Sequence, residues 1–427
     1  MSLRNKMNGK RGVLLKNTLM LYILQFSTYF FSFIVVPYET RVLGPVVFGL
    51  LGAATAAMVY FQNIIDFGFI LSGTADVALH KEDKKYLSRL FTSITLAKLL
   101  LALICAFVLL GLCRLISVWG DHTGFYFLFF ISIFLGSLMP DYLYRGLEQM
   151  EVITVRAVCI KAFFTVMIFV LLKDASQYWL IPVLNIIGNG VAFLCVYAHL
   201  KRKMGITFCL VSVKHVGKAL RDSMPFFFSR VATTVYTATN TVVLNIISGT
   251  GAVTGYYTSA DKLITTAKSG MSPISDSMYP YMVKNRDFKL VKKTLMLLMP
   301  IIILGCVVVG VIARPLCAWF FGAAFADSAD VLRVMLPVVV VILPSYILGF
   351  PTLSPMGLAK HANYSTIFGS VFYVCMILVL FATNHVSMIT LGALTSATEI
   401  LIFLYRLIVV CHYRERMKPA EEKEGTV

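Results

Sequence analysis

Long apolar stretches separated by short polar segments run through the whole chain of 427 residues. A membrane-spanning helix needs about 20 consecutive, mainly apolar residues. Twelve stretches meet that length, and they follow one another with short gaps. The expected spans are residues 17–37, 47–70, 89–113, 124–143, 150–172, 177–199, 222–247, 252–281, 292–313, 331–355, 363–383 and 387–411. The pattern therefore predicts an all-α integral membrane protein with about twelve transmembrane helices.

Lysines and arginines are concentrated in alternate segments between these spans. One set of alternate segments, which includes both ends of the chain, holds twenty-five of them, and the other set holds five. Basic loops are retained on the cytoplasmic side of a membrane. The bias therefore predicts a multi-pass protein with both termini cytoplasmic. It also accounts for the formal net charge of +17 without nucleic acid as a partner. With 58% hydrophobic residues, a soluble protein is excluded.

The longest connection between spans, residues 200–221, lies at the middle of the chain and is basic and amphipathic. It predicts a cytoplasmic linker between an N-terminal lobe (1–200) and a C-terminal lobe (222–411), followed by a cytoplasmic tail (412–427). A short motif at 47–54 reappears at 253–260, with Val, Gly and Ala at a constant offset of 206 residues. This echo favours two parallel six-helix repeats, an organisation that suits alternating access around a midplane site.

A stripe of polar side chains follows the expected span 222–247 at helical spacing. Apolar residues fill the positions between its members, so this helix must hide one face from lipid. The stripe consists of Arg230, Thr233, Thr234, Thr237, Asn240 and Thr241. A charged side chain inside a membrane is costly and is a functional-site hypothesis by default. Arg230 lies about 12 Å into the span at 1.5 Å per residue.

Further charged residues lie at depth in other spans. Lys161 is about 16 Å from the start of its span, near the midplane, and Lys98 lies at a similar depth. On the span 252–281, Asp261, Thr265 and Lys268 share one face, with Lys262 beside it. Cations outnumber the acids at mid-depth, which are mainly Asp261 and Glu399, although a pair between Asp261 and Lys268 would reduce the surplus. Unpaired cations bind anions, of which phosphate is the natural choice.

The deep acids allow two interpretations. Asp66, Asp261 and Glu399 are candidates for ion coupling, whereas a buried carboxylate such as Glu399 also commonly serves as a structural hydrogen-bond acceptor. Charged residues near helix ends, such as Arg145, Arg156 and Arg406, are expected either to extend their head groups toward the interface or to form buried ion pairs.

The sequence lacks the motifs of several classes of enzyme and of metal sites. It contains no nucleotide-binding GxxxxGK[ST] segment, no HExxH and no GxSxG. Nine cysteines lie mostly within apolar runs without CxxC or Cys/His spacing, so we expect neither a metal nor disulfides. We therefore expect a protein that is not an enzyme and needs no cofactor.

Several short motifs in the sequence resemble those of a known family. Residues 17–25 (NTLMLYILQ), 37–45 (PYETRVLGP) and Phe48-Gly49 are similar to the opening of Wzx-type polysaccharide flippases of the multidrug/oligosaccharidyl-lipid/polysaccharide exporter superfamily. Residues 68–78 resemble a later segment of that family, with Ala75 where the family often has arginine. Residues 252–263 resemble its AVGxYxxAxKL segment, with Thr254 where glycine is usual.

The resemblance implies a V-shaped exporter with two six-helix lobes around a cationic central cavity in the bacterial inner membrane. Its implied substrate is an oligosaccharide repeat unit on undecaprenyl pyrophosphate, moved from the cytoplasmic to the periplasmic leaflet for O-antigen, capsule or exopolysaccharide assembly. A polysaccharide polymerase and a chain-length regulator are the implied partners. Arg41 matches the family's motif arginine at the outer end of the first span. The cationic candidates for substrate binding are then Arg230, Lys268, Lys161, Lys98, Arg41 and Lys262.

Two other functions stay open at this stage. A cation-coupled drug exporter would share the architecture, but its cargo favours acidic and aromatic residues at depth rather than a surplus of cations. A membrane glycosyltransferase or polymerase would need a sizeable outer loop with catalytic acids or arginines. The longest expected outer loop, residues 313–331, has about 18 residues and carries Asp327 and Asp330.

Overall fold

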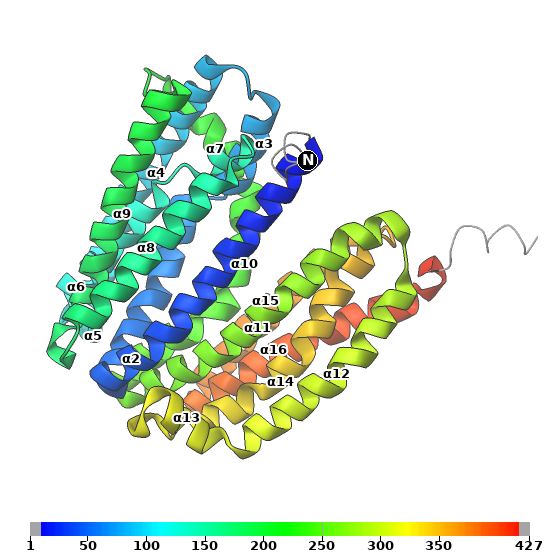
Figure 1. Cartoon of the computed structure of the whole chain (residues 1–427). Coiled ribbons are helices and arrows are strands. Elements are labelled where there is room, and N and C mark those ends of the chain that lie inside the picture. The colour runs from blue at the N-terminus through cyan, green and yellow to red at the C-terminus, as the bar shows by residue number, and fades with distance from the viewer. Residues whose placement is uncertain (1–9, 250, 418–427) are drawn as a thin grey trace, which may run out of the picture. The chain divides into compact units, whose positions relative to one another are not determined.

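The computed structural model describes residues 10–249 and 251–417, and these residues form helices and connecting segments without a β-strand (Figure 1). The first nine residues and most of the expected tail, residues 418–427, lie outside the described part. The chain divides into two units, and each is described by itself. Unit 1 comprises residues 1–43 and 53–231, and unit 2 comprises residues 44–52 and 232–427.

Unit 1 contains most of one very long helix and the eight elements that follow it. These are α2 (Lys10–Asp66), α3 (Phe69–Leu79), α4 (Lys84–Leu115), α5 (Ser117–Gly120), α6 (Thr123–Ser137), α7 (Asp141–Gly146), α8 (Met150–Leu171), α9 (Leu180–His199) and the first part of α10 (Val213–Ser248). Unit 2 contains the rest of α10 with α11 (Ala252–Asn285), α12 (Phe288–Val311), α13 (Ala313–Phe321), α14 (Ser328–Ile347), α15 (Ala359–Ala382) and α16 (Met388–His412).

Within the described residues, nine helical stretches are long and apolar enough to cross a membrane, judged by length and composition. The first of them, Lys16–Leu79, covers the region where the sequence predicts two spans. The long helices α10 and α11, which carry the polar residues singled out above, are not among the nine. The structure is therefore an all-helical membrane fold, as the apolar pattern predicted.

The sequence predicted a loop between the first two spans, at residues 38–46. This prediction is wrong, because helical structure continues through these residues. The chain stays helical from Lys10 to Asp66, and Gly44 alone breaks the pattern with φ 69° and ψ 173°. Glycine adopts a positive φ without steric cost, and proline is favoured at the first position of a helix. Gly44 followed by Pro45 therefore ends one helix and starts the next without an intervening loop.

The two copies of the repeated motif contact each other inside unit 2. A Cβ atom on Gly49 would lie 2.7 Å from the backbone nitrogen of Gly255, and one on Gly52 would lie 2.5 Å from the side chain of Thr258. Both pairs are separated by the 206-residue offset of the echo. The α2 segment and α11 thus approach at equivalent positions of the two motifs, through small residues of the kind that allow close helix packing in membranes.

We expect Gly255→Ala to disrupt this crossing. The added Cβ would lie 2.0 Å from the carbonyl oxygen of Pro45, and backbone atoms cannot move away as a flexible side chain could. Overpacking of this kind costs about 1–3 kcal/mol or more. Thermal unfolding of the purified protein in detergent should show a clear loss of stability. Gly305→Ala is the matched control, because nothing lies within 4 Å of its added Cβ. Equal stability of the two variants would contradict the described crossing.

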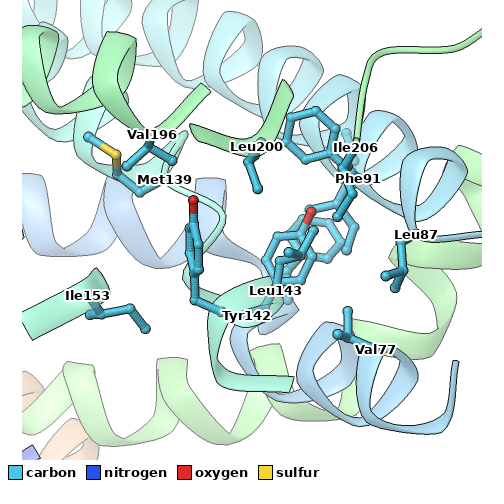
Figure 2. Packing of buried hydrophobic residues seen from close by; sticks show 14 of the residues in the cluster. Val77, Leu87, Phe91, Met139, Tyr142, Leu143, Ile153, Val196, Leu200 and Ile206 are labelled. Carbon is cyan, nitrogen blue, oxygen red and sulfur yellow. The ribbon is translucent and has the colours of Figure 1, made fainter. Parts of the chain in front are cut away.

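The core of unit 1 gathers at one end of its helices. Figure 2 shows part of this cluster, which joins α3, α4, α7, α8 and α9. The phenol ring of Tyr142 is buried between these helices. Phe91 is buried in the same cluster, and its ring centroid lies 5.5 Å from that of Tyr197. Ile206, from the expected linker, also belongs to this core. The residues expected to form a separate linker are therefore divided between the π-helical segment Leu200–Met204, an extended stretch at 205–212 and the start of α10.

The core of unit 2 lies where α11, α12, α14 and α16 meet. Met282 on α11, Leu343 on α14 and Leu353 beyond it are fully buried there. The helix α14 continues into a π-helical segment, Leu348–Thr352, in which Gly349 departs from helical geometry with ψ −124°. This distortion brings Gly349 against Arg406 of α16, whose guanidinium nitrogen lies 3.2 Å from the position of an added Cβ.

Candidate functional site

Lys98 is the most deeply buried of the predicted cations, and it is already paired. Its ammonium donates to the Oδ1 atom of Asp66 at 3.2 Å and also to the backbone carbonyl of Ser137. Only 7% of the Lys98 side chain is exposed, against 21% for Asp66. Asp66 thus covers the ammonium, and Lys98 presents little free charge to a ligand.

The hydrogen-bond acceptors of the Lys98 ammonium indicate that this residue has a structural role. Asp66 is the last residue of α2, and Ser137 is the last residue of α6. The final carbonyls of a helix lack intrahelical partners and attract cations. Directly after Asp66 the backbone turns through left-handed conformations at Phe67 (φ 40°) and Gly68 (φ 79°). Lys98 therefore caps the end of α6 and pairs with the side chain of the last residue of α2, next to the break that separates α2 from α3.

Lys268 is also paired, and its partner, Glu399, is not the residue that the sequence suggested. The ammonium of Lys268 on α11 lies 2.5 Å from the Oε1 atom of Glu399 on α16. Glu399 is 4% exposed and Lys268 is 18% exposed, so in this pair the cation is the more accessible member. The suggested pairing with Asp261 is replaced by this one. Asp261 lies two helical turns away and is half-buried.

Arg406 points into unit 2, where its hydrogen-bond acceptors are neutral oxygens, so it neither extends toward the interface nor donates to a carboxylate as expected for a residue near a helix end. Its guanidinium donates to the backbone carbonyl of Ser345 at 2.7 Å and to the hydroxyl of Ser365 at 2.9 Å. A third nitrogen lies 3.3 Å from the hydroxyl of Thr366. Neutral oxygens thus satisfy the donors of Arg406, which ties α16 to α14 and α15.

The polar stripe of α10 divides into two faces. Arg230, Thr233 and Thr237 are exposed and recur at spacings of three and four, so they line one face. Thr234, Asn240 and Thr241 are buried. The sequence predicted a single polar stripe, whereas in the structure only the first of these two faces is exposed.

Asn240 is the centre of a buried hydrogen-bond network in unit 2. Its amide nitrogen donates to the hydroxyl of Tyr257 and to that of Thr395, both at 2.7 Å. The hydroxyl of Tyr373 donates in turn to the amide oxygen of Asn240 at 2.5 Å. These contacts join α10, α11, α15 and α16. A fully satisfied polar network inside a membrane protein fixes helix packing, so Asn240 has a structural role here.

The remaining predicted residues differ in exposure. Lys161 is half-buried on α8 and shares a face with the buried Thr154, whose hydroxyl donates to the backbone carbonyl of Met20 on α2. Arg41, Lys262 and Thr265 are exposed. Arg41 precedes the Gly44 break by less than one turn of α2. The structure therefore leaves Arg230, Arg41 and Lys262 as exposed cations and Lys161 and Lys268 as partly accessible ones.

Within residues 10–249 and 251–417, no group of three or more His, Cys, Asp or Glu side chains could hold a metal ion. The features that sequence reasoning missed are the capping role of Lys98, the Lys268–Glu399 pair and the inward direction of Arg406. None of these has a local sequence signal, because each depends on which helices become neighbours.

The fold belongs to a known class of membrane transporter structures. The chain is similar to "Lipid II flippase MurJ, inward closed conformation", with a TM-score of 0.62 and 15% identity over 93% of this chain and 87% of that one. It is also similar to an inward-facing multidrug resistance MATE family transporter of the MOP superfamily, with a TM-score of 0.64 and 13% identity over 93% and 99% of the two chains. The MOP-type fold that the sequence resemblance implied is thus confirmed.

Sequence comparison then defines the family. The profile described as "Polysaccharide biosynthesis protein" matches residues 14–286, and the chain belongs to this family. A protein of Shigella dysenteriae described as "Putative O-antigen transporter" is 27% identical over 83% of this chain and 90% of its own length. A protein of Escherichia coli (strain K12) with the same description is 24% identical over 64% of this chain and 66% of its own length.

Proposed function

We propose that this protein is a flippase that moves oligosaccharide repeat units linked to undecaprenyl pyrophosphate from the cytoplasmic to the periplasmic leaflet of a bacterial inner membrane. The observation that carries the proposal is Arg230, an exposed arginine near the middle of α10 and within the span expected at residues 222–247. A cation at that depth must face something polar, and a diphosphate is the polar group of this cargo. Membership of the polysaccharide biosynthesis family supports the same cargo.

We further propose twelve transmembrane helices with both termini in the cytoplasm. The stretch Lys16–Leu79, with its break at Gly44, would supply two of them, and α10 and α11 would supply two more beyond the nine apolar stretches. The distribution of basic residues supports this parity, since a different count would place basic segments on both sides. The 206-residue offset at the α2–α11 crossing supports two repeats, expected as lobes at 1–200 and 222–411 joined by the segment 200–221.

The proposed mechanism is alternating access around a cationic central cavity, without nucleotide hydrolysis. Arg230, Lys161 and Lys268 would bind the diphosphate, with Thr237 and Thr265 as neutral hydrogen-bond donors. Arg41 and Lys262 would offer further positive charge at the exposed positions described above. Lys98 has a positioning role in this scheme because Asp66 already neutralises it. The polyprenyl tail would stay in lipid.

Glu399 is the proposed coupling residue. It pairs with the ammonium of Lys268, and a bound diphosphate would compete with it for the same ammonium. Exchange of Lys268 between Glu399 and the diphosphate is the proposed coupling step. Asp261, two turns away on α11, and Asp66 are secondary candidates for ion coupling. A polymerase and a chain-length regulator would use the transported repeat units.

The test is genetic. After deletion of the gene in its host, surface polysaccharide and the lipid-linked repeat unit on each leaflet are measured. We expect repeat units to accumulate on the cytoplasmic face, and we expect Arg230→Ala and Lys161→Ala to fail to restore export although the proteins insert. Lys173→Ala, an exposed lysine in the segment after α8, is the matched control and should restore export. Repeat units that reach the periplasmic face unpolymerised would contradict the proposal and favour a polymerase.

A further inference from the structure

A groove of about 750 Å³ lies between α8 and α9 of unit 1. Figure 1 shows these two helices side by side. Its lining residues on α8 are Glu151, Val152, Val155, Arg156, Cys159, Ile160 and Phe163, and those on α9 are Ile187, Gly188, Val191, Ala192, Cys195, Val196 and His199. They recur at spacings of three and four on each helix, so one face of each helix forms the groove. Most of the lining is apolar, and Val155 and Val191 are more than half exposed.

The groove has two chemically different ends. The two helices run in opposite directions, because Gly188 packs against Ile160 while His199 lies near Tyr144, just before α8. The polar lining residues Glu151, Arg156 and His199 therefore gather at one end, and Phe163 and Ile187 close the apolar end. The lining residues extend from Glu151 to Phe163 on α8 and from Ile187 to His199 on α9, which at 1.5 Å per residue gives a length of about 18 Å. That is roughly the depth of one leaflet of a hydrocarbon core about 30 Å thick.

The polar end carries a surplus of positive charge. Glu151 is paired with Lys16, and Arg156 is paired with Asp141 at 2.7 Å, so these four charges balance. Directly beyond His199, the π-helical segment exposes Lys201, Arg202 and Lys203. A lipid whose chain occupies the groove would therefore place its head group next to three basic side chains, which favours a phosphate.

We infer that this groove binds the polyprenyl chain of a phosphate-headed isoprenoid lipid, with the phosphate at the His199 end. The inference rests on the proposed function, because it gives the tail of the same substrate class a place on the protein. A groove only one helix pair wide accommodates one extended chain, whereas a diacyl phospholipid brings two. The opposite face of α8 carries Thr154 and Lys161, so this helix would contact head group and tail on different sides.

Two native cysteine thiols can be used to measure whether a lipid occupies the groove. Cys159 and Cys195 line it and are exposed, while Cys375 and Cys411 are exposed on helices of unit 2 and serve as internal controls. The full-length protein is reconstituted in phosphatidylcholine vesicles and labelled with N-ethylmaleimide, and each cysteine is quantified by mass spectrometry. Undecaprenyl phosphate at about ten times its Kd should slow labelling of Cys159 and Cys195 about tenfold and leave the controls unchanged.

A pair of variants on the same helix tests the location. Val191→Trp fills the groove and should abolish protection, since the added ring occupies the place of the chain. Leu194→Trp lies on the same helix, is 68% exposed and does not line the groove, so protection should persist. Cys105 and Cys113 are buried in unit 1, so their lack of labelling in both variants would show that this unit is folded.

Other outcomes would overturn the inference. Equal protection by phosphatidylglycerol would mean that the groove takes any anionic lipid, and equal protection by undecaprenol would mean that the phosphate is not recognised. Protection that increases with protein density, without added lipid, would assign the groove to a second copy of the chain. No protection by any probe would leave the groove without this ligand. The labelling assay measures binding alone and is therefore independent of the leaflet assay. If repeat units accumulate on the cytoplasmic face of the deletion strain but undecaprenyl phosphate gives no protection, only this inference is rejected. If undecaprenyl phosphate protects the two thiols but no repeat units accumulate, only the flippase proposal is rejected.

Discussion

Lys98→Met is expected to lower the free energy of unfolding by about 3–5 kcal/mol, because removing one partner of a buried ion pair leaves an uncompensated charge. The Asp66 carboxylate and the terminal carbonyl of α6 at Ser137 would both lose their donor. The effect should appear as a lower midpoint in denaturant or heat for the detergent-purified protein. Lys173→Met, which changes an exposed lysine, should alter stability by less than about 0.5 kcal/mol.

A double variant separates the structural role of Lys98 from substrate binding. Lys98→Met with Asp66→Asn removes both charges, so its loss of stability should be smaller than the sum of the two single losses. If Lys98→Met were as stable as the wild type and yet failed to export polysaccharide, Lys98 would be a substrate ligand, and the capping role assigned to it would be wrong.

The second large effect is expected at the Lys268–Glu399 pair. Lys268→Met leaves a carboxylate that is 4% exposed without its partner and should also destabilise the protein by about 3–5 kcal/mol. Glu399→Gln should be milder for stability, because the neutral amide can still accept a hydrogen bond from Lys268. In the proposed exchange, however, the neutral amide of Glu399→Gln competes poorly with the diphosphate for the ammonium, so transport should fall at least about tenfold.

The double variant Lys268→Met, Glu399→Gln provides the control for this interpretation. It removes both charges and should recover most of the stability that Lys268→Met loses. Transport should nevertheless stay absent, because the substrate has lost a cation and the pair can no longer exchange partners. Normal transport by the double variant would show that the pair only holds α11 against α16, and the coupling role of Glu399 would be rejected.

The membrane fold could be predicted from the sequence because lipid imposes its constraint locally. Apolar runs of sufficient length mark most helices, and the motif around Gly44 and Pro45 indicates the family even though the expected loop there is helical. Helix ends such as that of α4 were underestimated, since Asp83 caps the helix and extends it into the polar region before the apolar run.

The candidate site could be predicted only in part, because pairing depends on neighbours. Depth and periodicity identified Lys98, Lys268 and Asn240 as polar residues inside the membrane region. They could not show that Lys98 caps α6 and pairs with Asp66, that Glu399 from a distant part of the chain reaches Lys268, or that Asn240 is enclosed by Tyr257 and Tyr373. Sequence periodicity shows which residues share one face of a helix. The function of a buried charge depends on the side chains that several neighbouring helices place around it.

The central claim is that this chain moves a diphosphate-linked saccharide lipid across a bilayer, and reconstitution tests it most directly. The purified protein is placed in vesicles that contain a fluorescent oligosaccharide on undecaprenyl pyrophosphate, and a quencher that cannot cross the membrane is added outside. We predict that wild-type vesicles lose nearly all fluorescence, because lipid from the inner leaflet reaches the outside. Vesicles with Arg230→Ala should lose only the outer-leaflet share. Equal quenching in wild-type and protein-free vesicles, with the protein correctly folded and inserted, would contradict the account.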